Sequence, residues 1–183
     1  MDADLTVVEI PNIPGGSDSF ELAAKFCYGI NFEITTENIA MLRCTAEFLE
    51  MTKDYAVGNL VGRTEAYINE VALKSIAGAV SILHSSKNLL PIAEKVKLVS
   101  RCIDTIAFVA CKDSQFAASM RADGRLNDSK PIVDWWVEDL SVLRIDLFQR
   151  VLIAMMAKGF KQYALGPILM LYAQKSLRGL VKL

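Results

Sequence analysis

Apolar residues recur at helical spacing along almost the whole chain, and this period limits the fold more than any other feature. Ile92, Val96 and Val99 begin the longest such stripe, with intervals of three or four residues. The stripe continues far enough to predict one helix over Pro91–Cys111, with the proline tolerated in the first turn.

The same spacing predicts helices on both sides of this segment. Short polar residues precede several of them and can accept hydrogen bonds from the free N–H groups of a first turn. These further helices are predicted from Ser17 or Ser19 to Gly29, from Thr35 or Thr36 to Met51, from Tyr55 to Val71, from Ser75 to Leu83, from about Leu143 to Gly159, and from Pro167 to Gly179.

Three segments depart from the helical period. Leu5–Ile10 is short, β-branched and partly alternating, which predicts one strand ending at the turn of residues 14–16. Residues 32–34 read as a short extended link. Between Asp113 and Pro131 the pattern dissolves into small, polar and charged residues, which predicts a flexible loop. The fold class is therefore all-α, with at most one or two short strands near the N-terminus.

The composition supports a folded chain and argues against one class of partner. Hydrophobic residues make up 52% of the 183 residues and charged residues 22%, so burial can offset the entropy lost on ordering. Lys plus Arg total 20 against 21 for Asp plus Glu, a net charge of -1. Nucleic-acid-binding proteins are usually basic, so no nucleic-acid partner is predicted.

The cysteines and the start of the chain bear on localisation. Cys27, Cys44, Cys102 and Cys111 lie in apolar helical patterns without paired short spacing, as reduced, buried thiols do. The acidic residues 1–4 lack the basic and apolar segments of a secretory signal. No run reaches the roughly 18 apolar residues that span a bilayer. We expect a cytoplasmic protein, with peripheral contact at the plasma membrane as an additional option.

Candidate catalytic chemistry is sparse. His84 is the only histidine, and its place near a helix end favours capping or solvation over catalysis with Cys102 or Cys111. No Cys-x-x-Cys or His-x-x-x-His spacing supplies zinc ligands. The glycine turn at residues 14–16 lacks the rest of a phosphate-binding loop. We predict no enzyme activity, no metal and no cofactor.

The adjacent tryptophans Trp135 and Trp136 are a candidate partner-binding feature. Aromatic residues are common hot spots at interfaces, although buried packing is the favoured role here. Neighbouring residues point about 100° apart on a helix, so one ring can be buried while the other reaches a partner.

Two groups of motifs carry a family resemblance. The first comprises Val8-Glu9-Ile10, Ile13-Pro14-Gly15-Gly16, Phe26-Cys27-Tyr28-Gly29, and Thr36-Glu37-Asn38 through Met51. The second comprises Pro91 through Lys95, Arg101-Cys102-Ile103-Asp104, Asp134-Trp135-Trp136, and Gly159 through Lys175. They resemble, respectively, the second half of the BTB domain and the opening part of the NPH3 domain in the plant non-phototropic hypocotyl and root phototropism family. The resemblance predicts a partial BTB domain over residues 1–73 and part of an NPH3 domain over residues 74–183.

The resemblance also implies a function. Members of this family act as substrate adaptors of cullin-3 ubiquitin ligases and as scaffolds beside phototropin-type kinases. BTB domains contact cullin-3 through a loop before the last strand, the Tyr of the Tyr-Gly region and the next helix; Tyr28, Glu37 and Asn38 match the last two. The opening strands and dimer-forming helix of a BTB domain have no counterpart, and the NPH3 resemblance stops early. We therefore expect a chain truncated at both ends, with cullin-3 binding weakened or lost.

The C-terminal helices carry a local excess of basic residues, which suggests a second kind of partner. From position 144 onward one acid, Asp146, accompanies the bases Arg144, Arg150, Lys158, Lys161, Lys175, Arg178 and Lys182. Such a bias favours an acidic partner or an anionic membrane surface, unless the bases are simply the solvated face of amphipathic helices.

Overall fold

The first helix, α1 (Gly16–Cys27), begins at a glycine and not at the serine cap that the sequence predicts. Gly15 has φ 78°, a left-handed conformation, and a Cβ added there would lie 2.7 Å from the Met41 Cβ. Ser19 is buried, and its hydroxyl donates a 2.5 Å hydrogen bond to the carbonyl of Pro14. The serine therefore ties the entry turn to the helix instead of capping it.

The second helix, α2 (Ile39–Phe48), has Asn38 as its N-cap residue and no side-chain cap, so the cap predicted at Thr35 or Thr36 is not formed on the helix and Thr35 lies in the turn before it. The Ile39 amide donates to the Thr35 carbonyl at 3.0 Å, and the Thr35 hydroxyl accepts from the Asn38 amide at 3.3 Å. The helix ends before the predicted Met51, because Glu50 takes a left-handed φ of 53°.

The next two helices differ in how well their starts were predicted. The third, α3 (Leu60–Glu70), begins five residues later than the predicted Tyr55, because Gly58 has φ 75° and the Asn59 side chain caps the Gly62 amide at 2.7 Å. The fourth, α4 (Ile76–Ser85), has its predicted Ser75 cap, which accepts from the Gly78 amide at 3.0 Å. Short 3₁₀ turns, η1 (Ala72–Lys74) and η2 (Ser86–Asn88), flank α4.

The single helix predicted over Pro91–Cys111 is wrong in both length and continuity. The structure has a short α5 (Leu90–Lys95) and a long α6 (Leu98–Ala122), separated by Lys97 at φ 57°. The continuation of α6 also overturns the first part of the loop predicted over 113–131, because residues 113–122 are helical. The remainder of that predicted loop lies outside the described residues.

The C-terminal helices follow their sequence signals closely. The one-turn α7 (Val137–Leu140) precedes α8 (Ile145–Ala157), which Gly159 terminates with φ 93°. A 3₁₀ turn, η3 (Gln162–Ala164), leads into α9 (Leu165–Arg178), with the proline of its first turn as expected. The rings of Phe148 and Tyr172 stack with centroids 3.8 Å apart, which holds α9 against α8.

The structure, a computed structural model, describes residues 9–54, 56–122 and 136–178, and every regular element in these ranges is helical. The all-α prediction is confirmed. The strand predicted over Leu5–Ile10 lies outside the described residues up to position 8, and Glu9 and Ile10 are not in a strand. Within the same ranges, no helix is long and apolar enough to cross a membrane.

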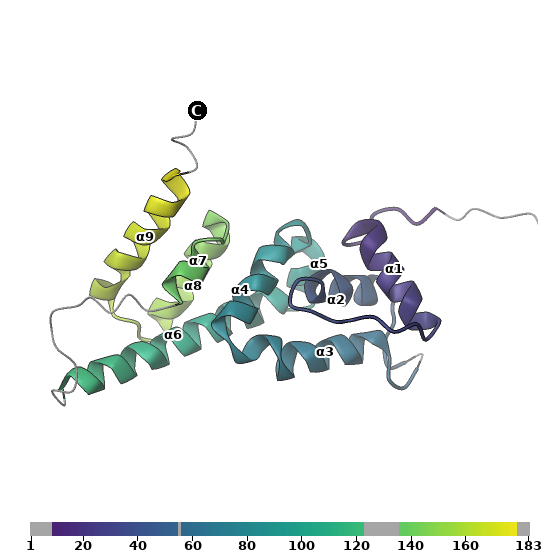
Figure 1. Cartoon of the computed structure of the whole chain (residues 1–183), viewed down its shortest axis with the longest axis horizontal. Helices are drawn as coiled ribbons and strands as arrows, with labels where there is room; N and C mark the ends of the chain where they lie inside the picture. Colours follow the sequence, from purple (N-terminus) through teal and green to yellow (C-terminus); the bar gives the residue numbers. More distant parts are fainter. Residues whose placement is uncertain (1–8, 55, 123–135, 179–183) are drawn as a thin grey trace, which may run out of the picture.

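The helices form an elongated molecule, with α1 near one end and α9 near the other (Figure 1). Helix α6 is central, because it packs against both α4 and α8, while α2 packs against α1 and α3. A large apolar core runs from Ile39 in α2 to Ile168 in α9. A second, smaller core of Ala23, Leu42, Ala46 and Leu60 joins α1, α2 and α3.

Candidate protein-binding surface

The segment between α1 and α2, residues 28–38, presents the first of the predicted partner-binding residues. Tyr28 follows α1, and its amide donates to the Ala24 carbonyl at 3.0 Å. Gly29 has φ 66°, which turns the chain out of the helix, and the Ile30 amide closes the turn on the Lys25 carbonyl at 2.9 Å. The Tyr28 side chain is left 83% exposed. A large aromatic side chain in this position has little structural use within the chain.

Asn38, the second predicted residue, shapes this segment. Its Oδ1 accepts from the Thr35 amide at 2.9 Å, and its Nδ2 donates to the Glu33 carbonyl at 2.9 Å. Together with the bond from its own amide to the Thr35 hydroxyl, these contacts hold the chain in one path before α2. Asn38 therefore acts on the shape of the surface, while Glu37 beside it is exposed.

The segment 28–38 exposes both apolar and acidic groups. Ile30 is exposed, and the carboxylates of Glu33 and Glu37 form no ion pair among the residues that the structure describes. The Arg63 guanidinium lies over the Phe26 ring, 5.6 Å from its centroid, in a cation–π arrangement. This pair forms part of the lining of a small pocket, together with Gly29, Ile30, Asn31 and Phe32.

The structure places Trp136 in the packing role and leaves its neighbour undescribed. The Trp136 ring has 0% exposure and meets Phe160 edge to face, with centroids 6.3 Å apart. Its Nε1 has no hydrogen-bond acceptor among the described residues. Trp135 lies outside them. The described ring of the pair thus offers no accessible area to a partner.

A partly buried ion-pair network, centred on Glu65, connects the segment before residue 74 with the segment after it. Arg43 on α2, only 7% exposed, donates to Glu65 on α3 at 2.8 Å and to Glu47 at 3.1 Å. Arg101 on α6 donates to the other Glu65 oxygen at 2.8 Å and to Asn69 at 2.7 Å. One carboxylate therefore bridges two arginines from the two parts that the sequence distinguishes.

Glu65 keeps its charge in this setting. Burial alone would raise the pKa of its carboxyl, but the hydrogen bonds from Arg43 and Arg101 outweigh it, and the pKa is lowered. The network positions α2, whose first turn ends the candidate segment at Asn38.

The basic C-terminal residues are largely neutralised by acids. The described ion pairs are Arg144 with Asp146, Arg150 with Glu94, Lys158 with Asp104, and Lys175 with Glu138. Three of the four acids are far from their partners in sequence, so the fold reduces the local basic excess that the sequence of this segment shows. Lys161 and Arg178 have no ion-pair partner in the part of the chain that the structure describes.

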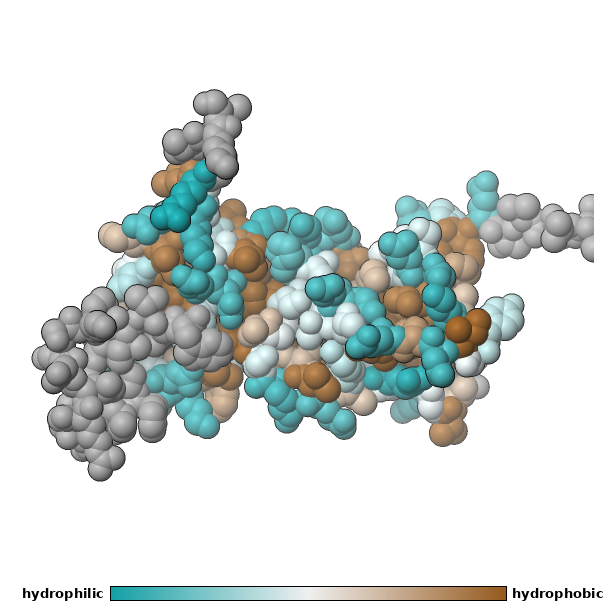
Figure 2. All heavy atoms as spheres, viewed as in Figure 1, coloured by the Kyte–Doolittle hydropathy of each residue, from teal (hydrophilic) through white to brown (hydrophobic). Residues whose placement is uncertain are grey.

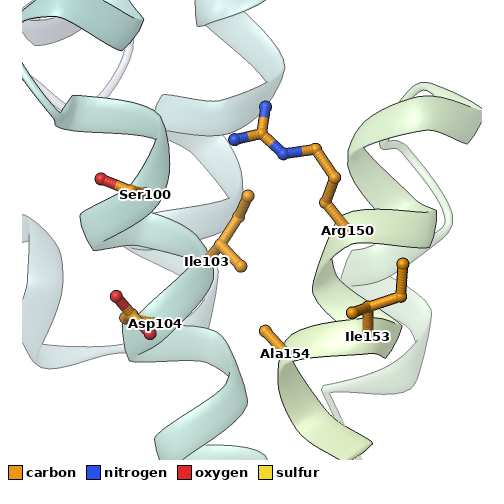
Figure 3. Close-up of a pocket in the computed structure, with 6 residues that line it drawn as sticks. All are labelled: Ser100, Ile103, Asp104, Arg150, Ile153 and Ala154. Atoms are coloured by element: carbon orange, nitrogen blue, oxygen red, sulfur yellow. The ribbon is translucent and has the colours of Figure 1, made fainter. Parts of the chain in front are cut away.

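A shallow groove between α6 and α8 is a second candidate binding feature. Ser100, Ile103 and Asp104 line it from α6, and Arg150, Ile153 and Ala154 line it from α8 (Figure 3). The sequence did not predict this groove. The apolar pattern of a helix indicates which face of that helix is buried, but not how closely two helices pack against each other. The ion pair between Lys158 and Asp104, separated by 3.2 Å, crosses the same helix pair.

The described residues give no support to a catalytic or metal site. His84 is exposed, and its Nδ1 lies 3.0 Å from the Val142 carbonyl. Burial raises the pKa of the Cys102 thiol to about 12 and also raises that of Cys111, which disfavours the thiolate that a nucleophile needs. No group of three His, Cys, Asp or Glu side chains is placed to hold a metal ion among these residues.

Comparison with known proteins shows close relatives. Residues 134–182 match the sequence model of the NPH3 family. The chain is 65% identical to the BTB/POZ domain-containing protein SR1IP1 of Arabidopsis thaliana over 98% of this chain and 31% of the relative. It is 41% identical to Root phototropism protein 2 of the same plant, over 99% of this chain and 29% of the relative.

The chain spans about a third of the length of these relatives. No solved structure matches it. The match to the NPH3 family and the identity along the whole chain to proteins named for the BTB/POZ domain and for root phototropism agree with the two groups of motifs. The chain belongs to the plant non-phototropic hypocotyl and root phototropism family of BTB/POZ and NPH3 proteins.

Proposed function

We propose that this chain is a protein-binding part of an adaptor and has no catalytic role. One observation carries the proposal: the exposed Tyr28 ring stands at the start of the segment 28–38, where backbone hydrogen bonds hold the turn after α1, and side-chain hydrogen bonds of Asn38 and Thr35 fix the other end. A preformed aromatic surface loses little entropy on binding and is typical of interaction hot spots. The relatives' BTB/POZ names support protein binding in general.

The proposed partner is the N-terminal domain of a cullin-3 scaffold. This choice follows from the family resemblance, in which the Tyr-Gly region and the next helix contact the cullin. Here Tyr28 is exposed and Glu37 is beside the start of α2, so both are available for such a contact. We further propose that the BTB part ends near Leu73, that the NPH3 part follows it, and that the protein acts in the cytoplasm.

Calorimetry between the chain and a cullin-3 N-terminal domain tests this proposal. Tyr28→Ala should weaken binding by about thirty-fold or more, because removal of a hot-spot aromatic side chain typically costs about 2 kcal/mol or more of binding free energy. The matched control is Tyr163→Ala, since Tyr163 is 82% exposed but lies just after α8, away from α1. Equal affinities of the two variants would contradict the proposed surface.

A second arm separates the ligase role from a scaffold role. Phototropin-type kinases and anionic membranes are the alternative partners, tested by pull-down on the kinase and by co-sedimentation with anionic vesicles. Four of the C-terminal bases are paired with acids, which reduces the electrostatic support for a membrane contact. Binding to the kinase without binding to the cullin would replace the ligase role with a scaffold role.

A further inference from the structure

The charge of this chain is divided strongly between its two parts. Residues 1–73 contain 12 acidic and four basic residues, a net charge of −8, whereas residues 74–183 contain nine acidic and 16 basic residues, a net charge of +7. The near-zero total of -1 hides this division. The two parts also lie toward opposite ends of the long axis, with α1 and α9 as their markers (Figure 1). The molecule is therefore electrically polar along its length.

The acidic part carries an exposed surface whose carboxylates are unpaired. We define the head surface as Tyr28, Ile30, Glu33 and Glu37, all in the segment between α1 and α2. The Tyr28 and Ile30 side chains are 83% and 54% exposed. Neither glutamate has an ion-pair partner among the described residues. Apolar area flanked by free negative charge fits a partner with apolar area flanked by free positive charge.

The basic part carries such a counterpart where α6 meets the end of α8. We define the tail surface as Phe108, Lys112 and Lys161. The Cys111 thiol lies 3.5 Å from the Met155 carbonyl, and this contact brings the two helices together between Lys112 and Lys161. Phe108, one turn before Lys112, is 60% exposed. Neither lysine has an ion-pair partner in the described ranges.

Both ends of the molecule also expose apolar side chains on the face shown in Figure 2, where brown residues reach the surface near α1 and near α8 and α9. Apolar surface at the ends of an elongated, electrically polar molecule favours contact with a second molecule of the same kind. The acidic end of one copy is complementary in charge to the basic end of another copy. Two acidic ends, or two basic ends, would repel each other.

We propose that the chain associates head to tail, with the head surface of one copy seated on the tail surface of the next. Such a contact is heterologous, because different surfaces meet, so it continues from copy to copy unless the rotation between copies closes a ring. The association is expected to be weak and sensitive to salt, because exposed charges are screened over about 8–10 Å at physiological ionic strength. It shares Tyr28 and Glu37 with the proposed cullin contact but does not depend on that function.

Sedimentation velocity of the full chain at increasing concentration tests the association. At about 50 mM salt the chain should form species larger than a monomer, and at about 500 mM salt these should dissociate, since screening shortens the Debye length. Two double variants follow: a head variant with Glu33→Lys and Glu37→Lys, and a tail variant with Lys112→Glu and Lys161→Glu. Each variant alone should self-associate at least about ten-fold more weakly than the parent, because like charges then face each other across the contact.

Mixing the two variants gives the decisive result. The head variant keeps a native tail, the tail variant keeps a native head, and the reversed head and reversed tail again carry opposite charges. A 1:1 mixture should therefore recover the association that each variant alone has lost. The control carries Glu70→Lys and Lys87→Glu, exposed charges outside both surfaces, and should associate like the parent. Circular dichroism of each variant would check that it is folded.

Three results would overturn the proposal. The parent could stay monomeric at low salt, one variant could associate as the parent does, or the folded mixture could fail to pair. Tyr28→Ala could lose cullin binding and still self-associate, in which case this proposal would rest on the charged residues alone. The charge variants could instead bind the cullin normally and no longer self-associate, which would show that the two contacts are separate.

Discussion

Glu65 and Arg101 form a 2.8 Å ion pair between α3 and α6, across the position where the sequence divides BTB from NPH3 motifs. The same carboxylate also accepts from Arg43, which is nearly buried. Because a buried guanidinium that loses a partner retains its desolvation cost, Glu65 should be important for stability as well as for the arrangement of the two parts.

Replacing Glu65 with Gln should lower the free energy of unfolding by about 1–3 kcal/mol, because Arg43 and Arg101 lose their shared charged partner. Urea unfolding followed by far-ultraviolet circular dichroism measures the change. Glu70→Gln is the matched control, since Glu70 is exposed at the end of the same helix. A loss no larger than that of the control would contradict the structural role of the network.

The Glu65 contribution should depend on pH with a defined sign. Its pKa in the folded chain lies below the ordinary value of 4.5, so the unfolded chain binds the proton more readily. The stabilisation is therefore complete above pH 4.5 and is lost as the pH falls through the folded pKa. Unfolding free energies of the parent and Glu65→Gln, measured from neutral to acidic pH, should converge in this window. A difference that widens on acidification would contradict the assignment.

Trp136 should behave as a core residue. Trp136→Ala removes a fully buried ring that contacts Phe160 and should destabilise the chain by about 3–5 kcal/mol. Trp136→Phe should cost much less, because it keeps most of the apolar packing and the indole N–H has no acceptor among the described residues. Thermal and urea unfolding of both variants measure the order. Similar stabilities of the Ala variant and the parent would place the ring outside the core.

Two helical glycines should respond in opposite directions to alanine. A Cβ at Gly78 would lie 2.2 Å from the Ala72 carbonyl oxygen, so Gly78→Ala should force η1 from α4 and destabilise the chain by about 1–3 kcal/mol. At Gly166 in α9 nothing lies within 4 Å of the added atom. Gly166→Ala should therefore stabilise by up to about 1 kcal/mol through helix propensity. Unfolding midpoints that shift in the same direction for both would contradict this contrast.

Local signals account for the parts of the fold that the sequence predicted. Ser75 caps α4 and Gly159 ends α8, because each acts on backbone groups within a few residues. The break at Lys97 has no such signal, since lysine rarely adopts the left-handed conformation that separates α5 from α6. Residues 113–122 remain helical because alanine, methionine and arginine favour helix even without an apolar stripe.

The candidate surface shows the same limit. Family motifs pointed to Tyr28 and Glu37, which the structure leaves exposed, and to Asn38, which it uses to hold the segment. No local pattern could pair Glu65 with Arg101, 36 positions apart, or place Lys158 beside Asp104. These contacts depend on how helices pack, which sequence spacing alone does not specify.

The large core that crosses position 73 has a consequence for protein engineering and for evolution. Ile39, Cys44 and Ile68 pack in one cluster with residues of α4, α6 and α8, so the named parts do not divide the apolar interior. A chimera that joined the first 73 residues of one relative to the remainder of another would recombine mismatched halves of a single packed interior. The unit that can be exchanged with its core intact therefore includes α2 through α9 together, and core substitutions on one side of the motif boundary are expected to need compensating changes on the other.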